Sequence, residues 1–174
     1  MPRVSAVDGL PVVAGGAYRG VLRAVILTAK ERHGLGLLPE LAAVLARAVG
    51  EYPGDLLLVP VPTAPARIRE RGVDLPLDVA LLSARMLRRS GRRVRVVRGL
   101  RLRRVPADQA RLSAAARSEN VAGAMRWAPK FCPDSAIIVD DLVTTGSTLR
   151  EAVRACAECG VPVRGAACLA RPAR

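Results

Sequence analysis

Aromatic residues are scarce in this chain, and their scarcity limits how the protein can recognise a partner. They make up 2% of the 174 residues, as one Trp, two Tyr and one Phe. A single-stranded nucleic-acid binder built on base-stacking platforms needs exposed aromatic rings, so the composition argues against that design. Because 51% of the residues are hydrophobic, the chain still has enough apolar material for an ordered, aliphatic core.

Several targeting and binding signals are also missing. No segment is long and apolar enough to span a bilayer, and the first residues lack the charged and then apolar pattern of a secretory signal. We therefore expect a cytoplasmic protein without membrane insertion. No Gly-rich loop ends in Gly-Lys-Ser/Thr, which excludes a P-loop as a phosphate site. With no repeat and no linker, residues 1–174 are expected to form one domain.

The four cysteines provide neither a disulfide framework nor a complete zinc-ligand set. Cys156 and Cys159 have the C-x-x-C spacing that is typical of metal or redox sites, but the only histidine, His33, is far away in the sequence. Both cysteines fall inside an expected helix. We interpret them as small core residues, with metal binding as the alternative, and we assign no protein ligand to a metal.

The charge balance is strongly positive. The chain has 28 Lys and Arg against 15 Asp and Glu, a net charge of +13, and Lys30 and Lys130 are its only lysines. An excess of this size attracts polyanions, such as a diphosphate-bearing substrate or a nucleic acid. An arginine-rich surface without a ligand would have the same composition, so charge alone does not separate these interpretations.

The most informative stretch is residues 137–148, IIVDDLVTTGST. Its apolar, β-branched run predicts a buried strand, which ends abruptly in Asp140 and Asp141. Apolar residues then recur at helical spacing from Leu149. Thr148 and Glu151 fit a capping box, which predicts a helix that begins near Thr148.

The turn between this strand and helix has the composition of a phosphate site. Backbone N–H groups at the start of a helix have no intrahelical partner and attract an anion. Hydroxyl groups and a glycine surround them, and we predict a phosphate-binding turn formed by Thr144, Thr145, Gly146, Ser147 and Thr148. Since Asp140 and Asp141 would repel a phosphate, we expect them to accept hydrogen bonds from vicinal sugar hydroxyls. The predicted ligand is therefore a ribose phosphate.

The rest of the chain alternates between strand and helix patterns. Helices are predicted at 18–29, 38–49 and 75–90, and strands at 55–61, 94–97, 121–127, 136–139 and 163–169. Residues 1–16 are expected to be irregular or to form an edge strand. This alternation predicts an α/β fold with a central, mostly parallel sheet and helices on both faces.

Two further segments are basic and are predicted as loops. Arg67, Arg69 and Arg71 follow the strand at 55–61, and their guanidinium groups suit a diphosphate, although a solvated basic loop is the alternative. Residues 100–120 form a long polar stretch, and such loops are usually functional or disordered. Its distinctive polar residues are Arg104, Gln109, Arg117 and Asn120.

The signature at 137–148 resembles the binding motif of type I phosphoribosyltransferases. Together with Val59-Pro60-Val61-Pro62, the Arg-x-Arg-Gly at 69–72 and the spaced polar residues of 104–124, it makes the chain similar to the ComF family. Those proteins are competence-associated relatives of the amidophosphoribosyltransferases, and the resemblance covers residues 17–171. Many members also have an N-terminal four-cysteine zinc module, which the printed sequence lacks.

The resemblance implies a function as well as a fold. Asp140 and Asp141 would hold the ribose of phosphoribosyl diphosphate, residues 144–148 its phosphate, and 100–120 would be a flexible loop over the site. Magnesium would enter with the substrate, in a transferase of nucleotide metabolism that moves a phosphoribosyl group to or from a base or amine. The alternative is a module that senses phosphoribosyl diphosphate or a nucleotide in DNA uptake and contacts single-stranded DNA or uptake proteins. Homodimers are common among the relatives.

Overall fold

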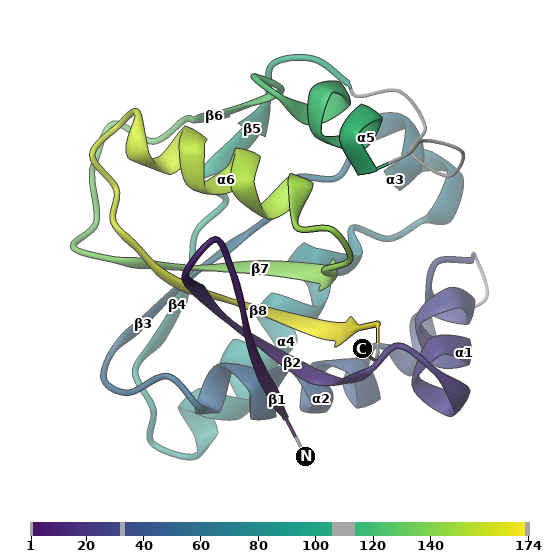
Figure 1. Ribbon diagram of the computed structural model, residues 1–174. Coiled ribbons are helices and arrows are strands. Elements are labelled where there is room, and N and C mark those ends of the chain that lie inside the picture. The colour runs from purple at the N-terminus through teal and green to yellow at the C-terminus, as the bar shows by residue number, and fades with distance from the viewer. Residues whose placement is uncertain (1, 32–33, 106–113, 173–174) are drawn as a thin grey trace.

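A six-stranded sheet forms the centre of the computed structural model, which describes residues 2–31, 34–105 and 114–172 (Figure 1). Its strands are β1 (Arg3–Val7), β2 (Leu10–Ala17), β3 (Leu56–Pro60), β4 (Val94–Val96), β7 (Ala136–Leu142) and β8 (Val163–Arg171). They lie in the order β1-β2-β8-β7-β3-β4. All neighbouring pairs are parallel except the antiparallel β1–β2 hairpin.

Helices cover both faces of this sheet, which confirms the predicted α/β fold class. The helices are α1 (Gly20–Ala29), α2 (Leu38–Gly50), α3 (Pro65–Arg71), α4 (Leu75–Arg89), α5 (Ala114–Val121) and α6 (Ser147–Ala157). α1, α2 and α4 contribute to one apolar cluster, and α6 contributes to the other. None of the helices in the described ranges has both the length and the apolar character needed to cross a membrane.

Strand β7 lies in the interior of the sheet and contacts both apolar clusters. Ile137 and Val139 belong to the cluster under α2 and α4, whereas Ala136 and Ile138 belong to the cluster under α6. Alternate side chains of a strand point to opposite faces, so a strand covered on both sides needs an uninterrupted apolar sequence. The strand stays buried through Asp140, the first polar residue in it.

The structure corrects the prediction that the arginine-rich segment after β3 is a loop. Arg67, Arg69 and Arg71 lie in the short helix α3. Pro65 occupies its first turn, where a missing N–H costs nothing, and Gly72 ends it with φ +74°. The sequence prediction missed this helix because seven residues are too few to show an apolar period.

The segment 100–120 was predicted as one uncovered loop, and this was wrong for the parts that the structure describes. It contains β5 (Leu100–Leu102) and most of α5, while residues 106–113 lie outside the described ranges. The predicted strand 121–127 does not return to the main sheet. Only β6 (Met125–Trp127) is extended, and it pairs antiparallel with β5 in a separate two-stranded sheet.

The edge strand that was one expectation for residues 1–16 is confirmed by β1, but the sequence did not predict the second strand, β2. β1 and β2 form a hairpin, and β2 is an interior strand between β1 and β8. Its burial was hard to foresee because Pro11, Gly15 and Gly16 interrupt the apolar pattern. The single histidine, His33, lies outside the described residues.

Candidate functional site

The acid pair and the hydroxyl-rich turn lie at the C-terminal end of β7, where the chain passes into α6 (Figure 1). The end of β3 borders the same edge, because Pro60 pairs with Val139 and the Val61 N–H donates to the Val139 carbonyl at 2.8 Å. Ligands of open α/β sheets bind outside the carboxyl ends of the strands. The structure therefore gathers the predicted ribose and phosphate residues at the edge where a ligand is expected.

Asp140 is a buried carboxyl that receives few hydrogen-bond donors from the part of the chain that the structure describes. The residue is 9% exposed, and its Oδ1 accepts the backbone N–H of Asp141 at 2.8 Å. Burial raises the pKa of Asp140, and the neighbouring charge of Asp141 raises it further, while the Asp141 N–H and Lys30 oppose the change. The carboxyl is thus held closer to its protonated form than a free aspartic acid.

Asp141 is paired with a lysine that sequence reasoning did not place in the site. The Lys30 Nζ lies 2.7 Å from Asp141 Oδ2, and the two side chains are 23% and 17% exposed. Lys30 follows the last residue of α1 and caps that helix. No spacing rule links positions 30 and 141, so this contact depends on how α1 packs beside the end of β7.

The turn that was predicted to bind phosphate leads into α6, but without the capping box that the sequence suggested. Gly146 is the N-cap with φ +81°, no side chain caps the helix, and Glu151 bonds elsewhere. A Cβ at Gly146 would lie 2.6 Å from Cγ1 of Val7 in the β1–β2 hairpin. Position 146 therefore requires glycine for two reasons: the backbone is left-handed there, and the neighbouring hairpin leaves no room for a side chain.

The hydroxyl groups of this turn are close to the start of the helix. Thr145 Oγ1 and Ser147 Oγ lie 2.9 Å apart, Thr144 is exposed, and Thr148 is half-buried. The first-turn N–H groups have no intrahelical acceptor, and the helix dipole places positive potential there. The turn thus has the donors that an anion needs, in agreement with the arrangement expected from the sequence.

A cavity of about 430 Å³ opens beside the end of β3. One wall is formed by the chain from Pro60 to Thr63 and by Pro65 and Ile68 of α3. Its basic wall is formed by Arg98, Arg101, Arg103 and Arg104, and Asp74 is the acidic residue among those that line it. Of the predicted arginines, only Arg104 lines the cavity. The prediction that Arg67, Arg69 and Arg71 bind a diphosphate stays a prediction.

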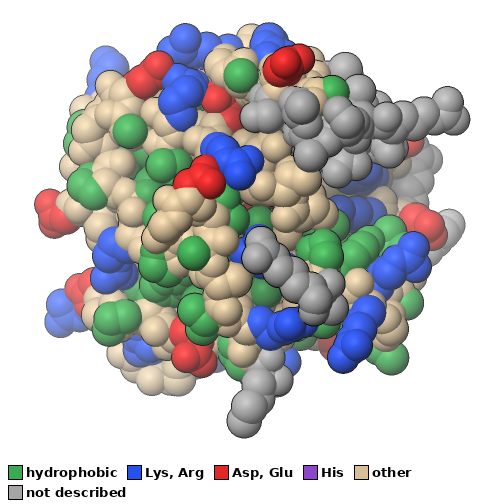
Figure 2. Space-filling view, viewed as in Figure 1, with side chains coloured by type: hydrophobic (Ala, Val, Ile, Leu, Met, Phe, Trp, Pro, Cys, Tyr) green, Lys and Arg blue, Asp and Glu red, His purple; other side chains and the backbone are tan. Residues whose placement is uncertain are grey.

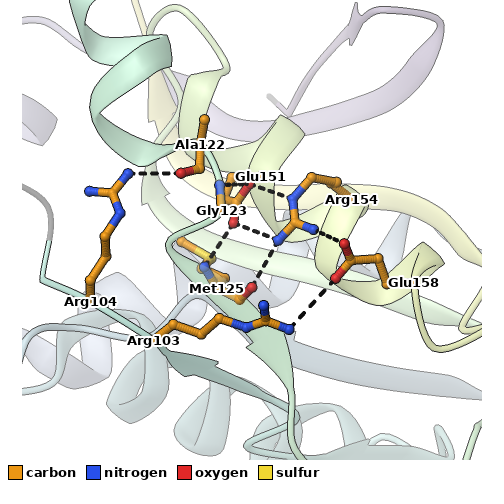
Figure 3. A network of polar contacts seen from close by, with 8 residues as sticks. All are labelled: Arg103, Arg104, Ala122, Gly123, Met125, Glu151, Arg154 and Glu158. Atoms are coloured by element: carbon orange, nitrogen blue, oxygen red, sulfur yellow. Dashed lines mark hydrogen bonds and ion pairs between the residues drawn. The ribbon is translucent and has the colours of Figure 1, made fainter.

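An ion pair between the buried Glu151 and the partly exposed Arg154 joins α6 to the base of the β5–β6 sheet (Figure 3). Glu151 Oε2 accepts the Gly123 N–H at 3.0 Å, and Oε1 accepts the Met125 N–H at 2.7 Å. Arg154 donates to both carboxylate oxygens and also to the Met125 carbonyl at 2.9 Å. Burial would raise the pKa of Glu151, but the bonds from Arg154 and the two amides outweigh it and lower that pKa.

Two arginines at the end of β5 extend this network. Arg104 donates to the Ala122 carbonyl at 2.7 Å, and Arg103 lies 3.9 Å from Glu158, which also pairs with Arg154 (Figure 3). The β5–β6 sheet is therefore attached to the helix whose first turn is the predicted phosphate site. Among the other predicted loop residues, Asn120 is half-buried in α5, Arg117 lies in the same helix, and Gln109 is outside the described residues.

The C-x-x-C pair is not the pair of core residues that the sequence suggested. Cys156 is fully buried on α6, but Cys159 lies beyond the end of this helix and is exposed. Within the described ranges, no three His, Cys, Asp or Glu side chains are grouped so that they could hold a metal ion.

Comparison with models of known protein families and with curated proteins found no match to this chain.

Proposed function

We propose that the protein binds phosphoribosyl diphosphate with Mg²⁺ and transfers the phosphoribosyl group to or from a base or amine. The observation that carries the proposal is that Asp140 and Asp141 end strand β7 and a short turn then leads directly into α6, all at the carboxyl edge of the sheet. A ribose phosphate needs acceptors for its hydroxyl groups and donors for its phosphate, and the end of β7 supplies the first and the start of α6 the second.

In this proposal the two carboxylates hold the ribose. Vicinal hydroxyls donate to Asp140 and Asp141, and the hydroxyls and N–H groups of residues 144–148 hold the 5′-phosphate. Lys30 donates to the same Asp141 carboxylate that a ribose hydroxyl would use. Lys30 therefore keeps the net charge of the acid pair low beside an anionic ligand.

The diphosphate is expected to face the arginine-lined cavity next to β3. The cavity is lined by Arg98, Arg101, Arg103 and Arg104. Guanidinium groups bind phosphate oxygens through paired donors. Four cations near one cavity stabilise the charge that develops on a departing diphosphate. Transition-state stabilisation would come from positioning and electrostatics rather than from a protein nucleophile.

The residues present fit magnesium that is bound chiefly through its substrate. Mg²⁺ keeps several waters and takes one or two carboxylates together with substrate phosphates, so it does not need a cluster of three protein ligands. Asp140 and Asp141 provide the carboxylate oxygens next to the predicted phosphate turn. When bound, the ion would neutralise charge on the diphosphate.

Calorimetric titration with phosphoribosyl diphosphate and Mg²⁺ tests this function directly. We expect micromolar binding that the Asp140→Asn/Asp141→Asn double variant loses. The matched control is Asp55→Asn/Asp134→Asn, because these exposed acids precede β3 and β7 at the opposite edge of the sheet. If the wild type does not bind, or if both double variants bind equally well, the proposal fails. Diphosphate release during a screen of bases and amines then tests for transfer.

A second candidate function is a sensing module in DNA uptake that contacts single-stranded DNA. The net charge of +13 favours it. Figure 2 shows basic side chains spread over the whole visible face rather than gathered in one track, which favours non-specific contacts with phosphates. Such contacts make affinity fall steeply with salt. Affinity for single-stranded DNA that did not change with salt would contradict this function.

A further inference from the structure

Two exposed cysteines that are distant in the sequence meet at the edge of the sheet opposite the predicted site. Cys132 lies in the connection between β6 and β7, and Cys159 follows α6. The Cys132 Sγ donates to the backbone carbonyl of Cys159 at 2.8 Å, across 27 positions of sequence. We propose that Cys132 and Cys159 form a dithiol site that low-molecular-weight disulfides oxidise reversibly to an intramolecular disulfide.

The hydrogen bond places the sulfur of Cys132 directly against the backbone of Cys159. A carbonyl oxygen lies less than about 2.8 Å from its own Cα, so the Cys132 Sγ lies at most about 5.6 Å from the Cys159 Cα. The disulfide also needs the two Cα atoms to be about 4.4–6.8 Å apart, so its formation requires rotation of χ1 in both exposed side chains together with small shifts of the two connections. Both residues lie in connections between elements, where small backbone shifts disturb no helix or strand.

The other two thiols, those of Cys156 and Cys168, are expected to react slowly with a small disulfide. Cys156 and Cys168 are fully buried, and burial raises the pKa of each thiol to about 12. Because the thiolate is the nucleophile, these two remain protonated and shielded at neutral pH. Exposure therefore selects Cys132 and Cys159 from the four.

The exchange is balanced by the small disulfide that drives it. One thiolate attacks RSSR, forming a mixed disulfide and releasing RS⁻. The second thiolate attacks the protein sulfur of that mixed disulfide, so the Cys132–Cys159 bond forms and the second RS⁻ leaves. Two protein thiols lose two hydrogen atoms, and RSSR is reduced to two RSH.

The new bond would close a loop that contains β7 and α6. A closed loop of this length restricts the unfolded chain, and for a protein of this size the melting temperature is expected to rise by roughly 10 °C. Because the bond lies at the far edge of the sheet, the proposal does not depend on the ligand assigned to the other edge.

Oxidised glutathione is the probe for the experiment, applied to the whole protein at mildly alkaline pH. We expect the intact mass to fall by two hydrogen atoms, two of the four thiols to resist alkylation under denaturing conditions, and peptide mapping to find the 132–159 cross-link. Reduction should restore all four thiols and the lower melting temperature. A Cys132–Cys159 bond without a rise in melting temperature would support the dithiol site but contradict the expected stabilisation by the disulfide.

Two variants make the test specific. Cys156→Ser should keep the cross-link, whereas Cys132→Ser should lose it and hold a glutathione adduct at Cys159. Four free thiols after oxidation, stable adducts on the wild type without a cross-link, or a Cys156–Cys159 bond would each overturn the proposal.

Discussion

Two buried carboxylates in this structure have opposite environments. Glu151 is 4% exposed and receives two backbone N–H groups and an arginine, and its pKa is lowered. Asp140 is 9% exposed, receives one backbone N–H and lies beside another acid, and its pKa is raised. Burial alone therefore does not decide whether the pKa of a carboxyl group is raised or lowered. The hydrogen-bond donors and charges around the group decide the direction.

The difference separates a structural acid from a candidate ligand-binding acid. Glu151 has its acceptors used by the protein itself, so it stabilises the junction of α6 with the β5–β6 sheet. Asp140 keeps acceptor capacity that the described residues do not fill, at the edge of the sheet where ligands of open α/β folds bind. A buried charge without enough partners costs stability, and proteins keep such costs at sites with a function.

The largest expected effect comes from removing the structural acid. Glu151→Ala leaves the amides of Gly123 and Met125 without their acceptor and removes one of the partners of Arg154, and we expect the free energy of unfolding to fall by about 3 kcal/mol. Urea denaturation measures this change. The control is Glu158→Ala, which removes the half-exposed partner of Arg154 and should cost less than about 1 kcal/mol. Equal losses for the two variants would contradict the contrast between buried and exposed acids.

Removing the candidate ligand-binding acid, Asp140, should change the free energy of unfolding in the opposite direction. Asp140→Asn removes an under-compensated carboxyl, and we expect it to raise the free energy of unfolding by about 1–3 kcal/mol at pH 9 while abolishing ligand binding. The pKa of Asp140 is higher in the folded than in the unfolded protein. The contribution of Asp140 to the free energy of unfolding is therefore most favourable below the unfolded-state pKa, and it is lost as pH rises through the folded-state pKa. The gain should shrink towards pH 4. Thermal melts from pH 4 to 9 test this, and a variant less stable than the wild type at pH 9 would refute it.

The third prediction concerns the cation that partly compensates the acid pair. Lys30→Met leaves the Asp141 carboxylate without its ammonium partner, and the extra negative charge should weaken binding of phosphoribosyl diphosphate about tenfold, or about 1.4 kcal/mol. Titration calorimetry measures the affinity. Lys130→Met is the matched control, since Lys130 is the only other lysine and is exposed in the turn before β7. An unchanged affinity in Lys30→Met would remove Lys30 from the site.

The smallest effect is expected at the arginine-lined cavity. Arg101→Gln removes one exposed cation from its wall, and affinity for phosphoribosyl diphosphate should fall about threefold, as expected for a solvent-screened charge. Arg126→Gln is the control, because Arg126 pairs with Arg101 across β5–β6 but does not line the cavity. High salt should reduce the difference between the two variants.

The sequence was most informative where local pattern and burial agree. The apolar run before Asp140 predicted an interior strand, and the turn after it predicted the start of a helix, because both features depend on neighbouring residues only. Gly146 was likewise recognisable as a turn residue. The clash of a side chain there with Val7 was not, since the hairpin is far away in sequence.

Contacts between distant segments could not be predicted from the residues alone. Lys30 was treated as an ordinary turn residue, although it pairs with Asp141. Glu151 was assigned to a capping box because its spacing from Thr148 fits one, yet tertiary donors at Gly123 and Met125 outcompete that role. The helix α3 and the β5–β6 pairing were missed because short elements have too few residues to show a period.

The strand order has a consequence for how the chain acquires its structure during synthesis. β8 lies between β2 and β7, yet among the described strands it is the last to leave the ribosome. Until β8 emerges, the β1–β2 hairpin and the β7–β3–β4 group have no common neighbour, and an edge of each is unpaired. During this interval the unpaired strand edges of both groups are exposed to other chains and can aggregate with them. Translation that pauses before residue 163 should therefore increase aggregation more than a pause before residue 56.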